Sequence, residues 1–335
     1  MKNLSIRCMI LFVAAAGLGL RTPAYCEERG RWTLISQSVT AQVKPGYPGK
    51  TAGVVVDPAS GELYMVVPDQ GLWKSTDHGQ SFARVDGMVI GGRCETGFAL
   101  NFDPAGKRLA CFMIYGSSGS TSDGGKTWTA FKTSHLDCGA VDWEDSGACY
   151  LALRHESGGQ LCLSADAGQT WKDLDKGFAA VGLFSVKSLI GSRGQNRGLV
   201  RSTDGGTTWQ AVSDVTPVGL VMRTFKGVGY WTTVMGLLVS RDQGQTWAIE
   251  GAPVSAVLGP YWSQDGKRVV VVGYDGFHES TDAGATWQRV CPLPPDFSVR
   301  IIGPNYAWDA KANLFYASSM GKEAFRYDRY QVVKP

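Results

Sequence analysis

Ser202-Thr-Asp204-Gly-Gly206-Thr-Thr208-Trp209 is one copy of a phrase that occurs six times along this chain of 335 residues. The phrase reads Ser/Thr-x-Asp-x-Gly-x-Thr/Ser-Trp/Phe, and its successive aspartates are separated by 46, 43, 38, 38 and 40 residues. These aspartates are Asp77, Asp123, Asp166, Asp204, Asp242 and Asp282. A period of about 40 residues indicates an array of equivalent units that stack on one another.

The residue types of the phrase predict a hairpin turn. The aspartate can accept hydrogen bonds from backbone N–H groups a few residues further on, and the glycine adopts a positive φ that a side chain would resist. The Ser and Thr hydroxyls add local hydrogen bonds, and the aromatic ring packs beneath the turn as the next strand begins. Turn geometry alone accounts for the six aspartates, so we assign them a structural role rather than a catalytic one.

The intervals between the phrases contain apolar strands separated by turns rich in Asp and Gly. Residues 54–67 and 261–272 are two examples, in which apolar runs flank such a turn. Together with the strand that follows each phrase, this pattern gives four strands per repeat, which is the size of one β-propeller blade. The expected fold class is therefore all-β, and the expected architecture is a β-propeller.

The two ends of the chain supply a seventh blade. Residues 29–35, around Trp32, have the form of a strand that follows the phrase. Near the other end, residues 299–302, 314–317 and 323–327 read as three further strands. An N-terminal strand that completes the last blade would close the ring and remove an exposed sheet edge. We therefore expect a single seven-bladed domain over residues 27–335.

Residues 1–26 read as a secretory signal peptide. Lys2 and Arg7 precede an apolar run over residues 8–20, which is too short to span a bilayer, and small residues follow it. We therefore expect a secreted or periplasmic protein with no membrane span. The net charge of +3, from 33 basic and 30 acidic residues, gives no indication of nucleic-acid binding.

Six cysteines follow the signal segment, in a compartment where disulfides can form. They are Cys94, Cys111, Cys138, Cys149, Cys162 and Cys291. The sequence does not select a pairing, and buried free thiols are the alternative. There is no Cys-x-x-Cys pair and the four histidines are scattered, so no metal site is recognised. No nucleotide, flavin or haem motif is present, and no organic cofactor is expected; a divalent ion is left open.

The repeated phrase resembles the Asp-box, or BNR, repeat, and the resemblance covers about nine-tenths of the chain. Similar propellers occur in sialidases, in xyloglucanase-type glycoside hydrolases, in some polysaccharide lyases, in the sortilin ectodomain and in photosystem II assembly factors. Such a resemblance is specific for the fold and weakly specific for function. It implies glycan chemistry, glycan binding or protein binding.

Departures from these relatives narrow the range of functions that the resemblance implies. Sialidases carry a Phe/Tyr-Arg-Ile-Pro segment in the first blade, and here only Arg300-Ile-Ile-Gly303 is similar, in another blade, so a sialidase is not expected. Xyloglucanases carry a catalytic aspartate after the second strand of the first blade, and Asp69 lies one residue out of step with it. Asp275 stands in the corresponding turn of the sixth blade, which favours a turn role for both aspartates.

Ligands of propellers usually sit over the central channel, where polar turn residues gather. Glu95 with Asp137 or Glu156 could form a carboxylate pair for glycoside cleavage, and solvated loop charges are the alternative. Arg154-His155-Glu156 combines a cation, a base and an acid, although the following Ser157-Gly-Gly159 indicates a polar hairpin tip. The candidate catalytic residues are Asp69, Glu95, His155, Glu156 and Asp275.

Basic and aromatic residues at the channel mouth are candidates for binding a ligand. Arg93, Arg154, Arg193 and Arg223 could gather around an anionic sugar or carboxylate, or they could simply be solvated. Aromatic rings could stack on sugars, although packing between blades is the more ordinary role for tryptophans outside the repeats. The ligand-binding candidates are Arg93, Arg154, Arg223, Trp231, Tyr274 and Tyr306.

These observations predict a secreted propeller that recognises a polysaccharide or oligosaccharide, with glycoside hydrolase or polysaccharide lyase activity as the enzymatic form. The alternative is a non-catalytic scaffold that binds a protein or peptide. A cleft with several acidic or basic groups close together would favour chemistry, and a flat or apolar face would favour a scaffold.

Overall fold

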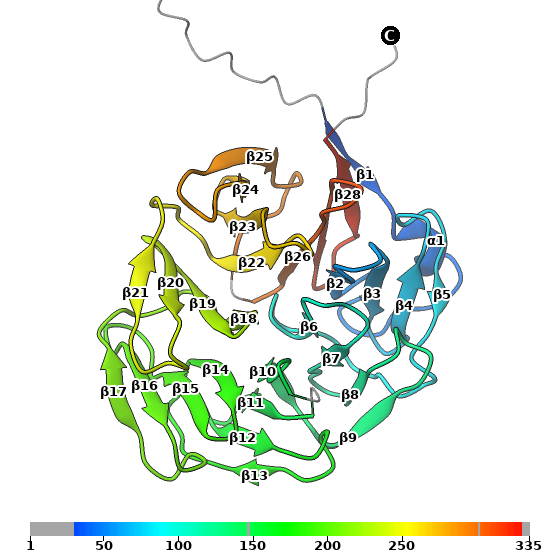
Figure 1. Cartoon of the computed structure of the whole chain (residues 1–335). Helices are drawn as coiled ribbons and strands as arrows, with labels where there is room; N and C mark the ends of the chain where they lie inside the picture. The colour runs from blue at the N-terminus through cyan, green and yellow to red at the C-terminus, as the bar shows by residue number, and fades with distance from the viewer. Residues whose placement is uncertain (1–29, 146–147, 301, 330–335) are drawn as a thin grey trace, which may run out of the picture.

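Seven four-stranded antiparallel sheets are arranged as blades around a central axis in the computed structural model of the chain (Figure 1). The structure describes residues 30–145, 148–300 and 302–329, so the predicted signal peptide, residues 1–26, lies outside the described residues. Blades 1 to 6 run outward in chain order, from a first strand at the axis to a fourth strand at the rim. The seven-bladed all-β propeller predicted from the repeat is confirmed.

The strands of the first three blades are β2 (Gly53–Val56), β3 (Leu63–Val67), β4 (Gly71–Ser75) and β5 (Ala83–Arg84); β6 (Leu100–Phe102), β7 (Leu109–Cys111), β8 (Ser117–Thr121) and β9 (Thr129–Ser134); and β10 (Leu136–Val141), β11 (Tyr150–Arg154), β12 (Leu161–Ser164) and β13 (Lys172–Asp173). Those of the next three blades are β14 (Ala180–Ser185), β15 (Ser188–Ser192), β16 (Leu199–Ser202) and β17 (Gln210–Ser213); β18 (Arg223–Phe225), β19 (Val228–Thr233), β20 (Gly236–Ser240) and β21 (Ala248–Glu250); and β22 (Leu258–Trp262), β23 (Val269–Gly273), β24 (Gly276–Ser280) and β25 (Gln288–Pro292).

The seventh blade joins the two ends of the described chain. It consists of β26 (Pro304–Asp309), β27 (Leu314–Ser319), β28 (Phe325–Asp328) and, as its outermost strand, β1 (Arg31–Leu34). In the antiparallel pairing of β1 with β28, Trp32 lies opposite Tyr327, and their ring centroids are 5.4 Å apart. Ring closure by the N-terminal strand is thus confirmed. A single helical turn, α1 (Gln37–Thr40), follows β1.

The first strand of this blade corrects one prediction. Residues 299–302 were expected to form it, yet the strand runs from Pro304 to Asp309. Gly303 has a φ of +99°, which separates the apolar run from the strand, and Ile302 before it is 58% exposed. β26 is buried along its whole length, so the innermost position goes to the segment that the core covers on both faces.

The repeated phrase forms the turn between the third and fourth strands of blades 1 to 6, as Asp123 illustrates. Its Oδ1 accepts hydrogen bonds from the backbone N–H groups of Lys126 and Thr127, each at 2.9 Å, and its Oδ2 accepts the Thr127 hydroxyl at 2.6 Å. The hydroxyl of Thr121 donates to Oδ1 and accepts the N–H of Gly125. These bonds to the ionised form lower the pKa of Asp123 from 3.8 to about 2. The structural role predicted for these aspartates agrees with this geometry.

The core lies between neighbouring blades and is rich in aromatic rings. Gly168 in the turn of blade 3 shows why the phrase needs glycine, because its φ is +80° and a Cβ there would lie 2.3 Å from the Phe131 ring of blade 2. Phe131 in turn packs against Tyr150, with ring centroids 4.8 Å apart. The turn of one blade is therefore seated on the outer strand of the blade before it.

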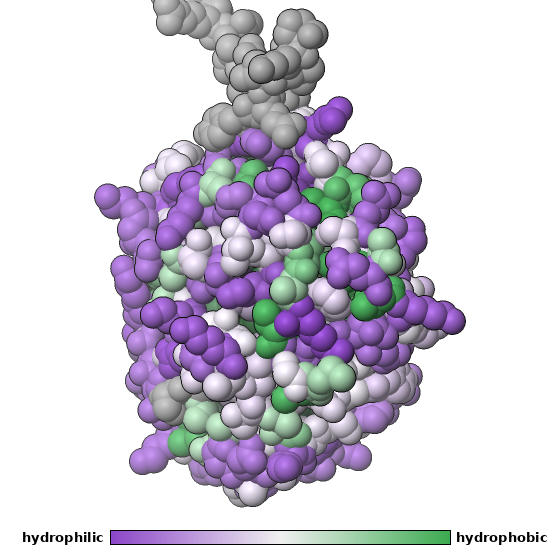
Figure 2. Space-filling model, turned by 90° about the vertical axis from the view of Figure 1, so that its right-hand side faces the viewer, coloured by the Kyte–Doolittle hydropathy of each residue, from purple (hydrophilic) through white to green (hydrophobic). Residues whose placement is uncertain are grey.

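The propeller has two different faces. The turns that join second to third strands, and the connections between blades, form what we call the top face. The turns that join first to second strands, and the Asp-box turns, form the bottom face. The side of the molecule that carries β4, β5 and α1 is mostly hydrophilic, with apolar residues scattered in small groups (Figure 2).

Two further observations bear on the sequence predictions. All six cysteines after the signal segment are buried and none forms a disulfide with another described residue, so the free-thiol alternative describes them. No helix in the described part of the chain is long and apolar enough to cross a membrane.

Candidate functional site

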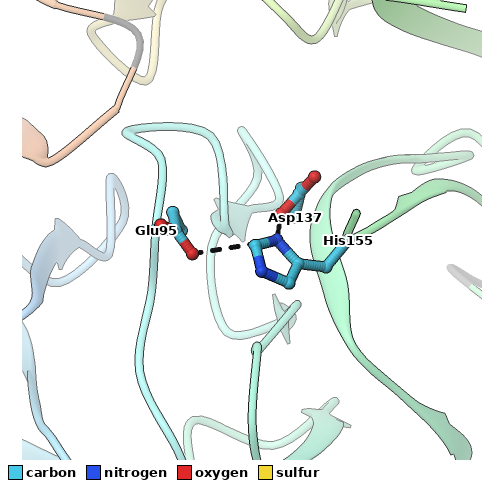
Figure 3. A group of neighbouring side chains, drawn as sticks. All are labelled: Glu95, Asp137 and His155. Atoms are coloured by element: carbon cyan, nitrogen blue, oxygen red, sulfur yellow. Dashed lines mark hydrogen bonds and ion pairs between the residues drawn. The ribbon is translucent and has the colours of Figure 1, made fainter. Parts of the chain in front are cut away.

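A histidine of the top face is held between two carboxylates (Figure 3). The Nδ1 atom of His155 lies 2.7 Å from Oδ1 of Asp137 and 3.8 Å from Oε2 of Glu95. An ionised carboxylate can only accept a hydrogen bond, so Nδ1 donates its proton to Asp137 and the Nε2 atom of the neutral ring carries a lone pair. The three side chains come from β10, from the turn after β11 and from the connection before β6.

A β-bulge aims Asp137 at this histidine. Leu136 pairs with Arg154, and the next pair is Cys138 with Leu153, so Asp137 is the extra residue on β10. A bulge turns the side chain of its extra residue out of the regular alternation. His155 follows the last residue of β11 and is anchored by its backbone N–H, which donates to His135 O at 2.8 Å.

Tyr115 extends the hydrogen-bond chain on the other side of the imidazole. Its hydroxyl lies 3.1 Å from Nε2 of His155, and the two rings meet edge to face with centroids 5.2 Å apart. Tyr115 and Glu156 have φ values of 51° and 50°, a backbone region that non-glycine residues seldom adopt. Such strained residues concentrate at functional sites. Asp137, His155 and Tyr115 thus form a continuous carboxylate–imidazole–phenol chain.

Arg93 packs against the ring of Tyr115, the last member of this hydrogen-bond chain. Its guanidinium carbon is 4.7 Å from the ring centroid of Tyr115 and 5.1 Å from that of Tyr47. Arg93 forms no ion pair with any described carboxylate, so its charge is held in place by aromatic faces and not neutralised.

A cavity of about 450 Å³ opens beside these residues, and we call it the top cavity. Glu95, Asp137, His155 and Glu156 line its polar side. Its other walls come from the connections that lead into the first strands of blades 4, 5 and 7, which places it over the central axis. The volume lies in the range of small-ligand sites.

Burial sets the electrostatics of the cavity. Desolvation raises the pKa of the Asp137 carboxyl above its ordinary value of 3.8, although the hydrogen bond and charge of His155 oppose this change. Oε2 of Glu95 is buried and has no hydrogen-bond partner among the described residues. Two carboxylates near one imidazole, one of them incompletely satisfied, are typical of a site that handles protons or cations.

The same three residues could hold a divalent cation. One ligand atom each from Glu95, Asp137 and His155 lies within 4.8 Å of the others, so a modest rearrangement would bring them around one ion. Two carboxylates and one imidazole are a ligand set that first-row transition metals accept.

The structure brings together some of the predicted catalytic residues and leaves others apart. Glu95, His155 and Glu156 share the top cavity, with Oε1 of Glu156 3.6 Å from Nε2 of His155. Asp69 and Asp275 occupy the same turn in blades 1 and 6 and do not line it. Asp275 instead accepts a hydrogen bond from Nε2 of His278 at 2.7 Å.

The predicted arginine cluster does not form. Arg154 is paired with Asp173 at 2.7 Å, and Arg193 is paired with Asp175 at 2.5 Å. Arg223 lines a cavity on the bottom face, because β18 is only three residues long and Arg223 lies close to the bottom turn that leads into β19. On the top face, Arg93 alone among the four forms no ion pair with a described carboxylate, whereas the arginine that lines the top cavity is Arg154.

Two of the three aromatic candidates are in the core. Trp231 is fully buried in β19 and donates its indole N–H to Gly219 O, and Tyr306 is 2% exposed in β26. Both are therefore excluded from stacking on a ligand, and the packing role foreseen for such rings applies. Tyr274 is 61% exposed on the top face, but it does not line the top cavity.

The sequence pattern offers Asp137 only as one half of a carboxylate pair with Glu95, and it offers no role for Tyr115. The signal that could have joined Tyr115 to His155 is their equivalent position, since each stands in the turn between the second and third strands of neighbouring blades. The bulge at Asp137 leaves no mark in the residue types of β10.

Comparisons with known proteins agree with the repeat and the fold. The model of the BNR/Asp-box repeat family matches residues 200–211. The solved structure of YCF48 bound to D1 peptide is 14% identical, with a TM-score of 0.52 over 93% of this chain and 99% of that chain. The GH74 enzyme of Niastella koreensis is 15% identical, with a TM-score of 0.56 over 85% of this chain and 44% of that chain.

A third similar structure, the Pan2 WD40 domain of Neurospora crassa, is 10% identical with a TM-score of 0.55, over 93% of this chain and 99% of that chain. A search of curated protein sequences found no match. Identities this low bear on the fold and not on the chemistry of the site. The repeat match, the six Asp-box turns and the seven four-stranded blades show that the chain is a seven-bladed β-propeller built from Asp-box repeats.

Proposed function

We propose that the protein is a glycan-active propeller that cleaves acidic polysaccharides by β-elimination at the top cavity. The observation that carries this proposal is the hydrogen-bond chain from Asp137 through His155 to Tyr115, 2.7 Å and 3.1 Å long at its two links. A base oriented by a carboxylate, next to a hydroxyl that can give up its proton, is the machinery of general acid–base catalysis.

The reaction uses each member of the chain. Nε2 of His155 takes the C5 proton of a uronate sugar, the C4–O4 bond breaks as a C4=C5 double bond forms, and the Tyr115 hydroxyl protonates the departing oxygen. Transfer of the proton from His155 to the Tyr115 phenolate then restores both groups. Asp137 keeps the ring in the tautomer that leaves Nε2 free and stabilises the imidazolium while it exists.

Arg93 supplies the charge that this reaction needs. Removing a proton next to a carboxylate develops negative charge on that carboxylate, and a fixed cation stabilises it. Arg93 is unpaired among the described residues and lies 4.7 Å from the ring of the proton donor, Tyr115. A uronate bound against Arg93 would therefore lie close to both proton-carrying groups.

Hydrolysis fits the site less well. A glycoside hydrolase needs two carboxyl groups on opposite sides of the scissile bond. Here Glu95 and Asp137 both approach the same nitrogen, Nδ1 of His155, and Asp137 is already engaged there. The Glu156 side chain is 75% exposed, so it lacks the buried environment that is typical of a catalytic acid.

The proposal is tested by incubating the protein with polygalacturonate, alginate and hyaluronan, and with uncharged xyloglucan as a control. An eliminative enzyme produces an unsaturated sugar that absorbs ultraviolet light, on acidic substrates alone. His155→Gln should abolish the absorbance, and Tyr274→Phe, an exposed tyrosine of the same face, should leave it unchanged. New reducing ends without absorbance would assign a hydrolase instead.

A second candidate function is peptide binding, and a specific observation favours it. All but two of the exposed large apolar side chains among the described residues belong to the top face, the exceptions being Val186 and Ile249. Met88 is 78% exposed and Met235 is 59% exposed. The similar structure of YCF48 holds a peptide. Retention of peptides on an array, reduced by Met88→Ser with Met235→Ser, would support this function if no glycan is cleaved.

We also propose that the protein works outside the cytoplasm. The basic and apolar character of residues 1–26 supports export, and an acidic polysaccharide is an extracellular substrate. Fractionation of cells that express the full chain tests this. Recovery of the protein in the cytoplasm with residues 1–26 intact would contradict it.

A further inference from the structure

A second cavity opens at the opposite end of the central channel, on the bottom face, and we call it the bottom cavity. Its volume is about 60 Å³, which is room for ~4–6 water-sized groups. Its walls come from the ends of the first strands of blades 1, 2, 3, 6 and 7 and from the start of β18 in blade 5. None of its lining residues belongs to the top cavity.

Arg223 is the one charged residue that lines this cavity. It forms no hydrogen bond or ion pair with any described residue, and its guanidinium carbon lies 4.9 Å from the ring centroid of Tyr261. Its Nε atom is buried without a partner. Burial lowers the pKa of Arg223, which records the cost of keeping this cation away from water without a counter-ion.

Two carboxylates on this side of the propeller are engaged elsewhere. Asp57 and Asp103 follow the first strands of blades 1 and 2 and each accepts a backbone N–H of its own turn, at 2.8 Å in both cases. Asp103 also accepts a hydrogen bond from Nε of Arg108 at 2.6 Å. These two acids hold their turns closed, so neither of them serves as the counter-ion of Arg223.

The rest of the lining is largely apolar and rigid. Pro58, Pro104 and Pro260 contribute three side chains with no freedom to move. Trp262 is stacked on Phe225, with ring centroids 5.0 Å apart and planes 14° apart, so its orientation is also held. Such walls suit a short apolar group, and the single free guanidinium suits an anion, because its planar fork matches a carboxylate.

We propose that the bottom cavity binds a small organic carboxylate with a short apolar tail. The carboxylate pairs with the guanidinium that Tyr261 holds in place, and the tail packs between the prolines and Trp262. The cavity size limits the tail to a few carbon atoms. This site is separate from the proposed acid–base site, because the two cavities lie at opposite mouths of the channel and share no residue.

Isothermal titration calorimetry on the full mature chain tests this proposal, with propionate and butyrate as the ligands. Propionamide matches the shape without the charge, and propylammonium reverses the charge. We expect the two carboxylates to bind and both controls to bind at least about tenfold more weakly. An N-acetylated peptide ending in alanine tests whether the carboxylate belongs to a chain end, and its amide is the matched control.

Four variants complete the experiment. Arg223→Gln should weaken carboxylate binding by at least about tenfold, whereas Arg197→Gln, an exposed arginine, should leave it unchanged. Arg223→Met keeps the cavity apolar and removes the uncompensated charge, so it should fold and lose the rise in melting temperature that butyrate gives the wild type. Equal binding of propionamide and propionate, or full binding by either Arg223 variant, would overturn the proposal. Binding of carboxylates would be unaffected by His155→Gln, which separates this test from that of the proposed function.

Discussion

Nδ1 of His155 lies 2.7 Å from Oδ1 of Asp137, across a β-bulge that makes Asp137 the unpaired residue of its strand. The Asp137 carboxylate is partly buried, and in this position it accepts the hydrogen bond that orients the imidazole. The pair therefore links a local irregularity of the innermost strand to the orientation of His155, the one histidine among the described residues that line the top cavity.

Asp137→Asn is expected to preserve or raise stability at neutral pH while it lowers activity. The folded-state pKa of Asp137 is raised above 3.8 by burial, so the ionised carboxylate costs stability once the pH exceeds the folded pKa, and the cost is absent below 3.8. The variant should therefore equal or exceed the wild type in unfolding free energy at neutral pH, and this advantage should disappear in acid. Its activity should fall by about 10²–10⁴-fold. Urea unfolding at several pH values measures the first effect, and a variant that is less stable at neutral pH would contradict it.

Removal of metal ions is expected to leave activity intact. In the proposed reaction the proton carriers are His155 and Tyr115, and no ion is needed. Added Zn²⁺ should inhibit, because Glu95, Asp137 and His155 can converge on it and occupy the base. Assays with a chelator and with graded Zn²⁺ check both statements. Loss of activity with the chelator, restored by a divalent ion, would assign the three residues to a metal centre instead.

The aspartates of the Asp-box turns are expected to lose their contribution to the free energy of unfolding in acid. Hydrogen bonds to the ionised form lower the folded-state pKa of Asp77 and Asp123 from 3.8 to about 2, so their contribution is present above 3.8 and is lost as the pH falls towards 2. Asp123→Ala should lower the unfolding free energy by about 1–2 kcal/mol at neutral pH. The difference from the wild type should shrink in acid. A difference that stays constant down to pH 2 would contradict this account of the turn.

Closure of the ring by β1 is expected to stabilise the whole propeller. Trp32 packs on Tyr327, and its Nε1 donates to Pro292 O at 3.1 Å in the neighbouring blade 6. Trp32→Ala should lower the unfolding free energy by about 2 kcal/mol, since a half-buried ring and one hydrogen bond are lost. Tyr274→Ala, an exposed ring, serves as the control. Equal denaturation midpoints for the two variants would mean that closure contributes little.

The sequence was informative about the fold because Asp, Gly and Trp at a constant spacing form one local structure, the Asp-box turn. It was less informative at the last blade, where the apolar run of residues 299–302 resembles a strand and only Gly303, with its positive φ, excludes it. Strand order alone predicts that Trp231 and Tyr306 lie at the mouth of the central channel. Burial depends on packing between blades, and packing brings together residues remote in sequence.

The candidate site was predictable in part for the same reason. Glu95, His155 and Glu156 could be proposed from turn positions, because those turns share one face of a propeller. Tyr115 could not be joined to His155 without the geometry of neighbouring blades, and Asp137 depends on the bulge. The arginine cluster was wrong because Arg154 and Arg193 each found a carboxylate nearby and Arg223 points to the other face.

Mass spectrometry of the products from an acidic oligosaccharide tests the central claim most directly. β-Elimination leaves an unsaturated sugar at the new non-reducing end of the fragment on the reducing-end side of the break, so this fragment lacks one water molecule relative to the hydrolytic fragment. We predict this dehydrated fragment from the wild-type protein and its loss in Tyr115→Phe, with Tyr274→Phe behaving as the wild type. Two fragments that both have the full hydrolytic mass, or intact substrate from every acidic glycan tested, would contradict the assignment of Asp137, His155 and Tyr115 to an eliminative site.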